Sequence, residues 1–84
     1  MFGEVEAVRA LLAAGAEVDQ ADNKGETALY TAAECGRVEA IRALLQAGAD
    51  INRADNNGRT PLAAARAKNH EAAVLALVQA GATE

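Results

Sequence analysis

The chain is poor in the residue types on which most catalytic, metal-binding and nucleic-acid-binding sites depend. Its 84 residues include no tryptophan and one residue each of tyrosine, phenylalanine, histidine, cysteine, proline and methionine. Phe2 and Tyr30 alone do not supply the series of stacking platforms on which single-stranded nucleic acid is bound. A net charge of −4 also argues against the basic face of a phosphate-binding surface. We therefore expect no nucleic-acid partner.

The single cysteine, Cys35, excludes a disulfide within the chain and is typical of a reducing compartment. One cysteine and one histidine also fall short of the four ligands of a structural zinc site. No apolar run approaches the roughly 20 residues that cross a bilayer, and the start of the chain lacks the basic region of a secretory signal. We expect no cofactor, no metal, no membrane association, and an intracellular, cytoplasmic location.

Large apolar side chains are scarce as well. Valine, isoleucine, leucine and phenylalanine together occupy 17 of the 84 positions, whereas about a quarter of the chain is alanine. A conventional globule of this size with so few large apolar residues would be marginally stable. Alanine instead favours thin helices that pack closely, each burying a narrow stripe.

The strongest signal in the sequence is self-similarity at a spacing of 33 residues. Apolar, glycine and turn positions all keep one register without an insertion. The matching segments are Ala14–Ala16, Ala47–Ala49 and Ala80–Ala82 at the ends of the units, and Asp22–Gly25 with Asp55–Gly58 at their starts.

Each unit has the local signals of two helices. Aspartate first and glycine fourth favour a type I turn, and Thr60 followed by Pro61 then offers a helix N-cap, with Thr27 at the matching position of the preceding unit. We expect first helices over 28–35 and 61–68, ended at Gly36 and at Asn69. The second helix is indicated by an apolar stripe at helical spacing, Val38, Ile41, Leu44 and Leu45.

With these motifs the sequence resembles the ankyrin repeat family. Residues 22–54 read DNKGETALYTAAECGRVEAIRALLQAGADINRA, close to the family's D-x-x-G-x-T-P-L-H unit followed by an apolar helix and G-A-D-x-N. The resemblance implies an all-α repeat solenoid of stacked helix-turn-helix units joined by β-hairpin-like loops. We expect one domain over 1–84, divided into a half repeat at 3–21, a full repeat at 22–54 and a C-terminal capping repeat at 55–84.

Three departures from the family pattern affect these expectations. The histidine of T-P-L-H is replaced by Tyr30 and Ala63, which predicts a weaker hydrogen-bond ladder between repeats. Arg66 and Glu84 place charge on the C-terminal side, as a capping repeat does. The N-terminal unit lacks its first helix, so we expect either a fragment of a longer array or an N-terminal face closed by Met1 and Phe2 or by another chain. Closure by another chain would be self-association through this incomplete repeat.

The residues give little support for catalysis. Cys35 and His70 are a conceivable nucleophile and base, but the register places them in different units. Asp22 and Asp55 have a structural role at turns, and Glu34, Glu39 and Glu71 fall on helix surfaces. We therefore expect no enzyme and no catalytic, cofactor-binding or metal-binding residues.

The remaining candidate for function is a surface. Equivalent residues of stacked units line up into one strip of hairpin tips and first-helix faces. The resemblance implies that a protein partner, of unknown identity, binds there. Tyr30 is either an anchor for that partner or a partly buried framework residue, and Leu75 is predicted to face outward. The alternative function is a structural spacer within a longer array. The candidate contact residues are Asn23, Lys24, Glu26, Tyr30, Glu34, Cys35, Asn56, Asn57, Arg59, Ala67 and Lys68.

Overall fold

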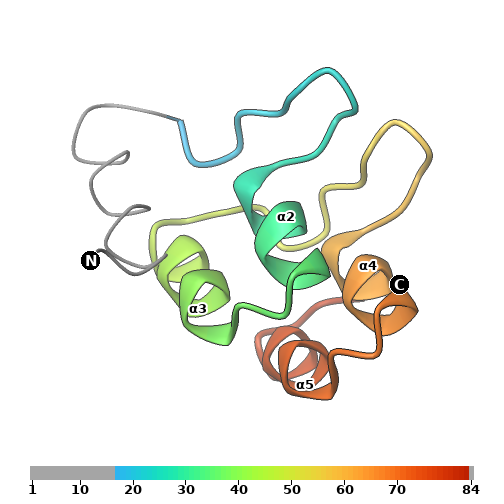
Figure 1. The fold of residues 1–84 in the computed structure, drawn as a ribbon. Coiled ribbons are helices and arrows are strands. Elements are labelled where there is room, and N and C mark those ends of the chain that lie inside the picture. Colours follow the sequence, from blue (N-terminus) through green and yellow to red (C-terminus); the bar gives the residue numbers. More distant parts are fainter. Residues whose placement is uncertain (1–16, 84) are drawn as a thin grey trace, which may run out of the picture.

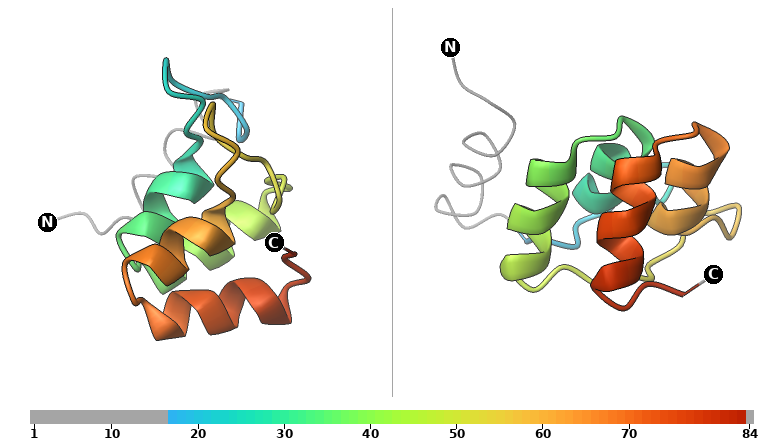
Figure 2. Two further views of the ribbon diagram at one scale, coloured as in Figure 1. Left: turned by 90° about the vertical axis from the view of Figure 1, so that its right-hand side faces the viewer. Right: turned by 90° about the horizontal axis from the view of Figure 1, so that it is seen from below.

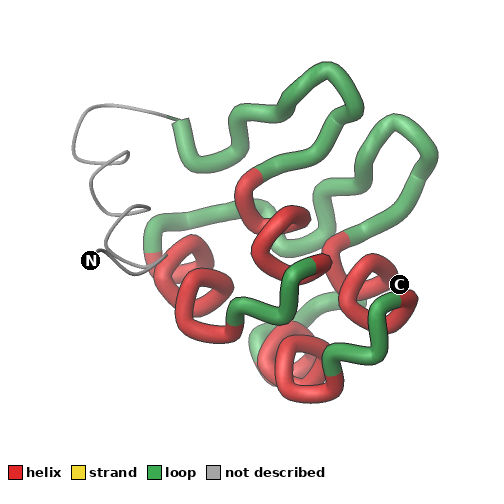
Figure 3. Tube along the Cα trace, in the orientation of Figure 1, coloured by secondary structure: helices red, strands yellow, loops and turns green. Residues whose placement is uncertain are grey.

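The computed structural model describes residues 17–83 and contains four helices over that range. In chain order they are α2 (Ala28–Glu34), α3 (Val38–Gln46), α4 (Pro61–Ala67) and α5 (Glu71–Gln79). Helices α2 and α4 lie side by side in one layer, and α3 and α5 lie side by side in a second layer (Figure 1). The described chain has no strand, only helices and loops (Figure 3). The expected all-α fold of stacked helix pairs is confirmed.

Both first helices begin where the sequence predicts, because a threonine caps each of them. The Thr27 hydroxyl accepts a hydrogen bond from the Tyr30 N–H, and the Thr60 hydroxyl accepts one from the Ala63 N–H, each at 3.2 Å. Each bond satisfies one amide that the first helical turn leaves without a partner. Pro61 follows the second cap at the first helical position, where its missing N–H is harmless.

The first helices end at residues in the left-handed region of the backbone. Gly36 has φ of 71° and Asn69 has φ of 60°, and asparagine is one of the few side chains that tolerates this conformation. The chain then reverses, and the Arg37 N–H donates to the Ala32 carbonyl at 2.8 Å. The helices stop one residue earlier than predicted, at Glu34 and Ala67, because Cys35 and Lys68 serve as C-caps.

The core lies between the two layers and joins both repeats. Leu29 and Leu62 from the first helices, with Ile41 and Leu77 from the second helices, are fully buried in one cluster. Small side chains fill the spaces between them, so the helices approach closely without many large residues, as the composition predicts. The alanines of this cluster are Ala32, Ala33, Ala40, Ala65 and Ala73.

The hairpin turn ahead of each first helix is held by one aspartate. Oδ1 of Asp22 accepts hydrogen bonds from the Lys24 and Glu26 N–H groups at 2.9 Å, and its carbonyl accepts one from the Gly25 N–H at 3.0 Å. Asp55 makes the same three bonds in the next repeat. The structural role predicted for both aspartates is confirmed.

Hydrogen bonds also join the two repeats at the hairpins. The Asn56 backbone N–H donates to the Lys24 carbonyl, and its side-chain amide donates to the Asn23 carbonyl, both at 2.9 Å. At the opposite end of the loops the Asp50 N–H donates to Asp19 Oδ1 at 2.8 Å. One repeat further on, the Thr83 N–H donates to Asn52 Oδ1 at 2.9 Å. This ladder fixes the hairpins at one spacing without the family histidine.

The predicted half repeat at 3–21 lies mostly outside the described residues, and Glu84 lies outside them as well. Val18, its one described large apolar residue, is half-buried and packs against the shared core. The helix pairs at 28–46 and 61–79 fall within the two units predicted at 22–54 and 55–84.

Alanine substitutions at the two turn glycines distinguish the cost of backbone strain from the cost of disturbing the contact between repeats. Gly25 and Gly58 have φ of 78° and 81°, so alanine at either position costs about 1–2 kcal/mol in backbone strain. A Cβ at position 25 would also lie 2.7 Å from the Asn56 nitrogen, whereas one at position 58 meets nothing within 4 Å. We predict that Gly25→Ala destabilises the chain by at least about 1 kcal/mol more than Gly58→Ala, measured by urea unfolding. Equal losses would contradict close contact between the hairpins.

Candidate functional site

The two hairpin tips project side by side from the same end of the molecule, above the layer formed by α2 and α4 (Figures 1 and 2). Most of the predicted contact residues are accessible along this strip, which we call the binding strip. Glu26 and Glu34 are half-buried. The exposed members are Asn23, Lys24, Cys35, Asn56, Asn57, Arg59, Ala67 and Lys68.

Tyr30 does not belong to the accessible surface. Its side chain is only 2% exposed, on the first helix of one repeat, and its hydroxyl is hydrogen-bonded to the carboxylate of Asp55 in the next. The interpretation of Tyr30 as a partner anchor is therefore corrected: Tyr30 is a framework residue, because burial leaves it no surface to offer. It stands where the family histidine is expected and joins the same two elements, a first helix and the following hairpin.

The environment of Tyr30 changes its acidity. Burial raises the pKa of the phenol above its ordinary 10.0, and the hydrogen bond to Asp55 and the negative charge of that carboxylate raise it further. The Arg59 side chain acts in the opposite direction. The pKa of Asp55 is held below its ordinary 3.8, first by the backbone N–H of Arg59 and then by Asn57 and Tyr30. Asp55 therefore remains charged at neutral pH and serves the fold.

Asn56 has a structural role that the sequence did not reveal. It is exposed, but both its backbone N–H and its side-chain amide donate to carbonyls of the preceding hairpin. Asn57 and Arg59 each donate a backbone N–H to the Asp55 carboxylate, and the Arg59 side chain also acts on the Tyr30 hydroxyl. The tips of the binding strip thus combine an asparagine that is bonded to the preceding hairpin with neighbours whose backbones are held by their own turn.

Cys35 and His70 are not arranged as a catalytic pair. The His70 ring lies over the backbone of Gly36, where a Cβ would come within 2.7 Å of its Nδ1 atom. Cys35 is exposed, and no hydrogen bond joins it to His70 in the described chain. His70 is packed between the repeats at the start of α5. Nor do residues 17–83 contain a group of three or more histidine, cysteine or carboxylate side chains placed to hold a metal ion.

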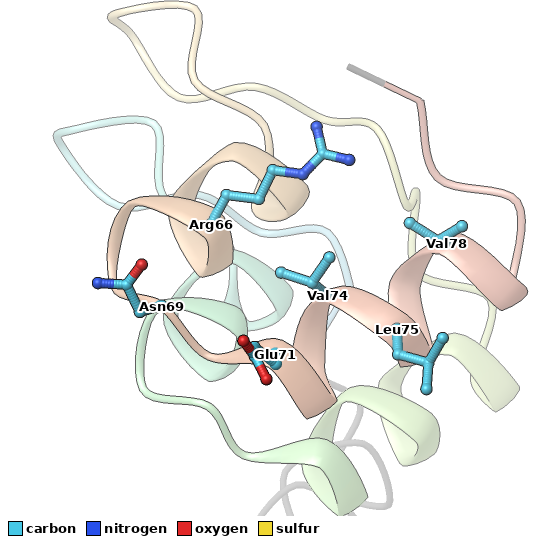
Figure 4. A pocket seen from close by; sticks show the side chains of 6 residues that line it. All are labelled: Arg66, Asn69, Glu71, Val74, Leu75 and Val78. Atoms are coloured by element: carbon cyan, nitrogen blue, oxygen red, sulfur yellow. The ribbon is translucent and has the colours of Figure 1, made fainter.

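A second surface, at the outer side of the last described repeat, was only weakly indicated by the sequence. A hollow of about 410 Å³ lies between α4 and α5, with apolar side chains from α5 on one side (Figure 4). The signal for it was Leu75, which stands where Arg42 stands in the preceding repeat and is 57% exposed, as predicted. The lining residues are Arg66, Asn69, Glu71, Val74, Leu75 and Val78.

Comparison with known proteins assigns the fold. A family model described as ankyrin repeats (3 copies) matches residues 1–83. The chain belongs to the ankyrin repeat family. Among solved structures it is similar to the human ASB11 ankyrin repeat domain, with 28% sequence identity and a TM-score of 0.83. The match covers 99% of this chain and 41% of that one, so this ankyrin chain spans less than half of its structural relative. No curated protein sequence matches it.

Membership in the ankyrin repeat family carries a general functional meaning. Ankyrin repeats are protein–protein interaction modules, and the family is generally non-catalytic. In residues 17–83, none of the helices has both the length and the apolar character needed to span a bilayer.

The single tyrosine makes the contact between the repeats measurable, because the chain has no tryptophan to mask its absorbance. We predict that Tyr30 titrates above pH 10.0 in the folded chain, and that Asp55→Asn lowers its pKa by removing a charge and weakening a hydrogen bond. Glu34→Gln is the matched control and has a smaller effect, since Glu34 acts on Tyr30 only weakly through its charge. The measurement is ultraviolet absorbance during alkaline titration, with circular dichroism to confirm folding.

The raised pKa of Tyr30 also predicts how the stability of the folded chain changes with pH. Because folding raises the pKa of Tyr30, its contribution to stability is fully present below pH 10.0 and is lost as the pH rises through the folded-state pKa. The variant Tyr30→Phe should lack this alkaline loss in urea unfolding. A tyrosine midpoint at or below 10.0 that Asp55→Asn leaves unchanged would contradict the contact.

Proposed function

We propose that the chain binds a partner protein through the binding strip of hairpin tips and first-helix faces. The observation that supports this proposal is a contrast between two classes of position in the repeats. Positions inside the stack keep their residue types and are buried, as with Leu29 and Leu62. Positions on the strip are accessible and differ between repeats, as with Lys24 and Asn57.

The charges on the binding strip differ between the two repeats. Glu26 of the first described repeat corresponds to Arg59 in the second, and Cys35 corresponds to Lys68. The second repeat thus presents basic side chains where the first presents acidic or neutral ones, and Asp55 between them is already bound to its own turn. A partner with an acidic segment opposite Arg59 and Lys68 would be oriented on the strip by charge.

The strip is also formed before binding. Each turn is closed by its aspartate, and the Asn56 bonds hold one hairpin to the other. Little backbone ordering is then required on association, which favours affinity from a modest contact area.

Affinity capture with paired variants tests this proposal. We predict that the double variant Lys24→Ala with Arg59→Ala loses a partner that the unmodified chain retains, with affinity reduced at least about tenfold. The matched control, Arg42→Ala with Arg53→Ala, removes the same charge from exposed positions of α3 and the loop that follows. The control should retain the partner, with binding measured by calorimetry once the partner is identified.

Two results would contradict binding through the strip. Equal loss in both double variants would indicate a general charge effect, and capture of no partner by any variant would support the alternative of a structural spacer in a longer array. The division into units at 3–21, 22–54 and 55–84 and self-association through the first of them are part of the same proposal. Light scattering that shows a monomer at high concentration would remove self-association.

A further inference from the structure

The hollow at the outer side of the last repeat is separate from the binding strip. Helix α5 buries Ala73 and Leu77 against the rest of the chain. Its opposite side carries Leu75 and Val78, which are 57% and 45% exposed, beside the half-buried Val74. Figure 4 shows these three side chains on α5, where they line part of the hollow. We call them the α5 outer face.

The α5 outer face continues an interface that the chain already uses. Val74 and Val78 lie one repeat length after Ile41 and Leu45 of α3. There the same positions are covered by the next repeat: Ile41 is fully buried and Leu45 is half-buried against the shared core. The element that packs beside them in the second layer is α5 itself. A helix beside α5 would extend the row that α3 and α5 begin.

The α4 side of the same end carries larger side chains than the equivalent side of α2. Arg66 stands at the position of Ala33, which is fully buried under the following repeat, and Asn69 stands at the position of Gly36. At Gly36 a single added Cβ would meet the next histidine ring at 2.7 Å. A further repeat in register would meet a long arginine side chain and an asparagine where the second repeat meets alanine and glycine.

A second copy of the chain is a poorer match for this end than a single helix. In a symmetric dimer the same patch forms both halves of the interface, so one hollow of about 410 Å³ would face another and leave a void between them. A single convex helix fills such a hollow and needs only the α5 side to be open.

We propose that the α5 outer face is a second binding site, which takes one amphipathic helix of a partner protein. The apolar stripe of that helix packs on Val74, Leu75 and Val78 and extends the second layer by one member. The site is independent of the binding strip and lies on the outer side of the last described repeat.

A peptide copy of α5 is the appropriate probe, because α5 is the helix that covers the equivalent face within the chain. The peptide spans residues 70–80, carries Leu75→Lys joined to Glu71 through a lactam to stabilise its helix, and bears a fluorophore. We expect saturable binding to the intact chain by fluorescence anisotropy. Leu75→Lys with Val78→Lys in the protein should weaken this binding at least about tenfold.

Matched variants make the outcome decisive. Ala72→Lys adds a charge at another exposed position of α5 and should change binding less than about twofold. Lys24→Ala with Arg59→Ala should leave it unchanged, which separates this site from the binding strip. The proposal is overturned by any of three results with a folded protein: no saturation at millimolar peptide, binding that Leu75→Lys with Val78→Lys does not weaken, or a dimer that those substitutions dissociate.

Discussion

The structure depends on the close side-by-side packing of two helical hairpins held at one constant register. Alanine makes this packing possible, since Ala33 and Ala65 are fully buried at places where a larger side chain would separate the repeats. The few large apolar residues are then sufficient, because Leu29 and Leu62 belong to one cluster that both repeats share. Neither repeat closes that cluster alone, so fold and stability arise at the seam between them.

The same seam organises the surfaces on which function is proposed. Stacking brings the hairpin tips together, and Asn56 and Tyr30 then connect the hairpin and the first helix of the first repeat to the hairpin of the second. A side chain on the strip is therefore positioned by its neighbouring repeat as well as by its own turn. On the outer side of the last described repeat, Leu75 and Val78 are exposed on α5.

Features set by local chemistry could be predicted from the sequence. Thr27 and Thr60 cap their helices and Asp55 closes its turn because each acts on a backbone group within four residues. The location of Tyr30 could not be decided in this way, since its burial and its bond to Asp55 depend on how two repeats meet. The hollow beside Val74 could not be predicted from the sequence either. It depends on how α4 and α5 pack together as well as on the apolar pattern of α5.

Hydrogen exchange at Asn56 tests the stacking of the repeats most directly. Its backbone N–H donates to Lys24 of the preceding repeat at 2.9 Å, and it is therefore protected only while the two hairpins are together. The account predicts that this amide opens with the same free energy as the amides of α4, so that hairpin contact and helix are lost in one cooperative step. Exchange of Asn56 at the rate of an unstructured peptide, while the α4 amides stay protected, would show that the repeats fold without being joined.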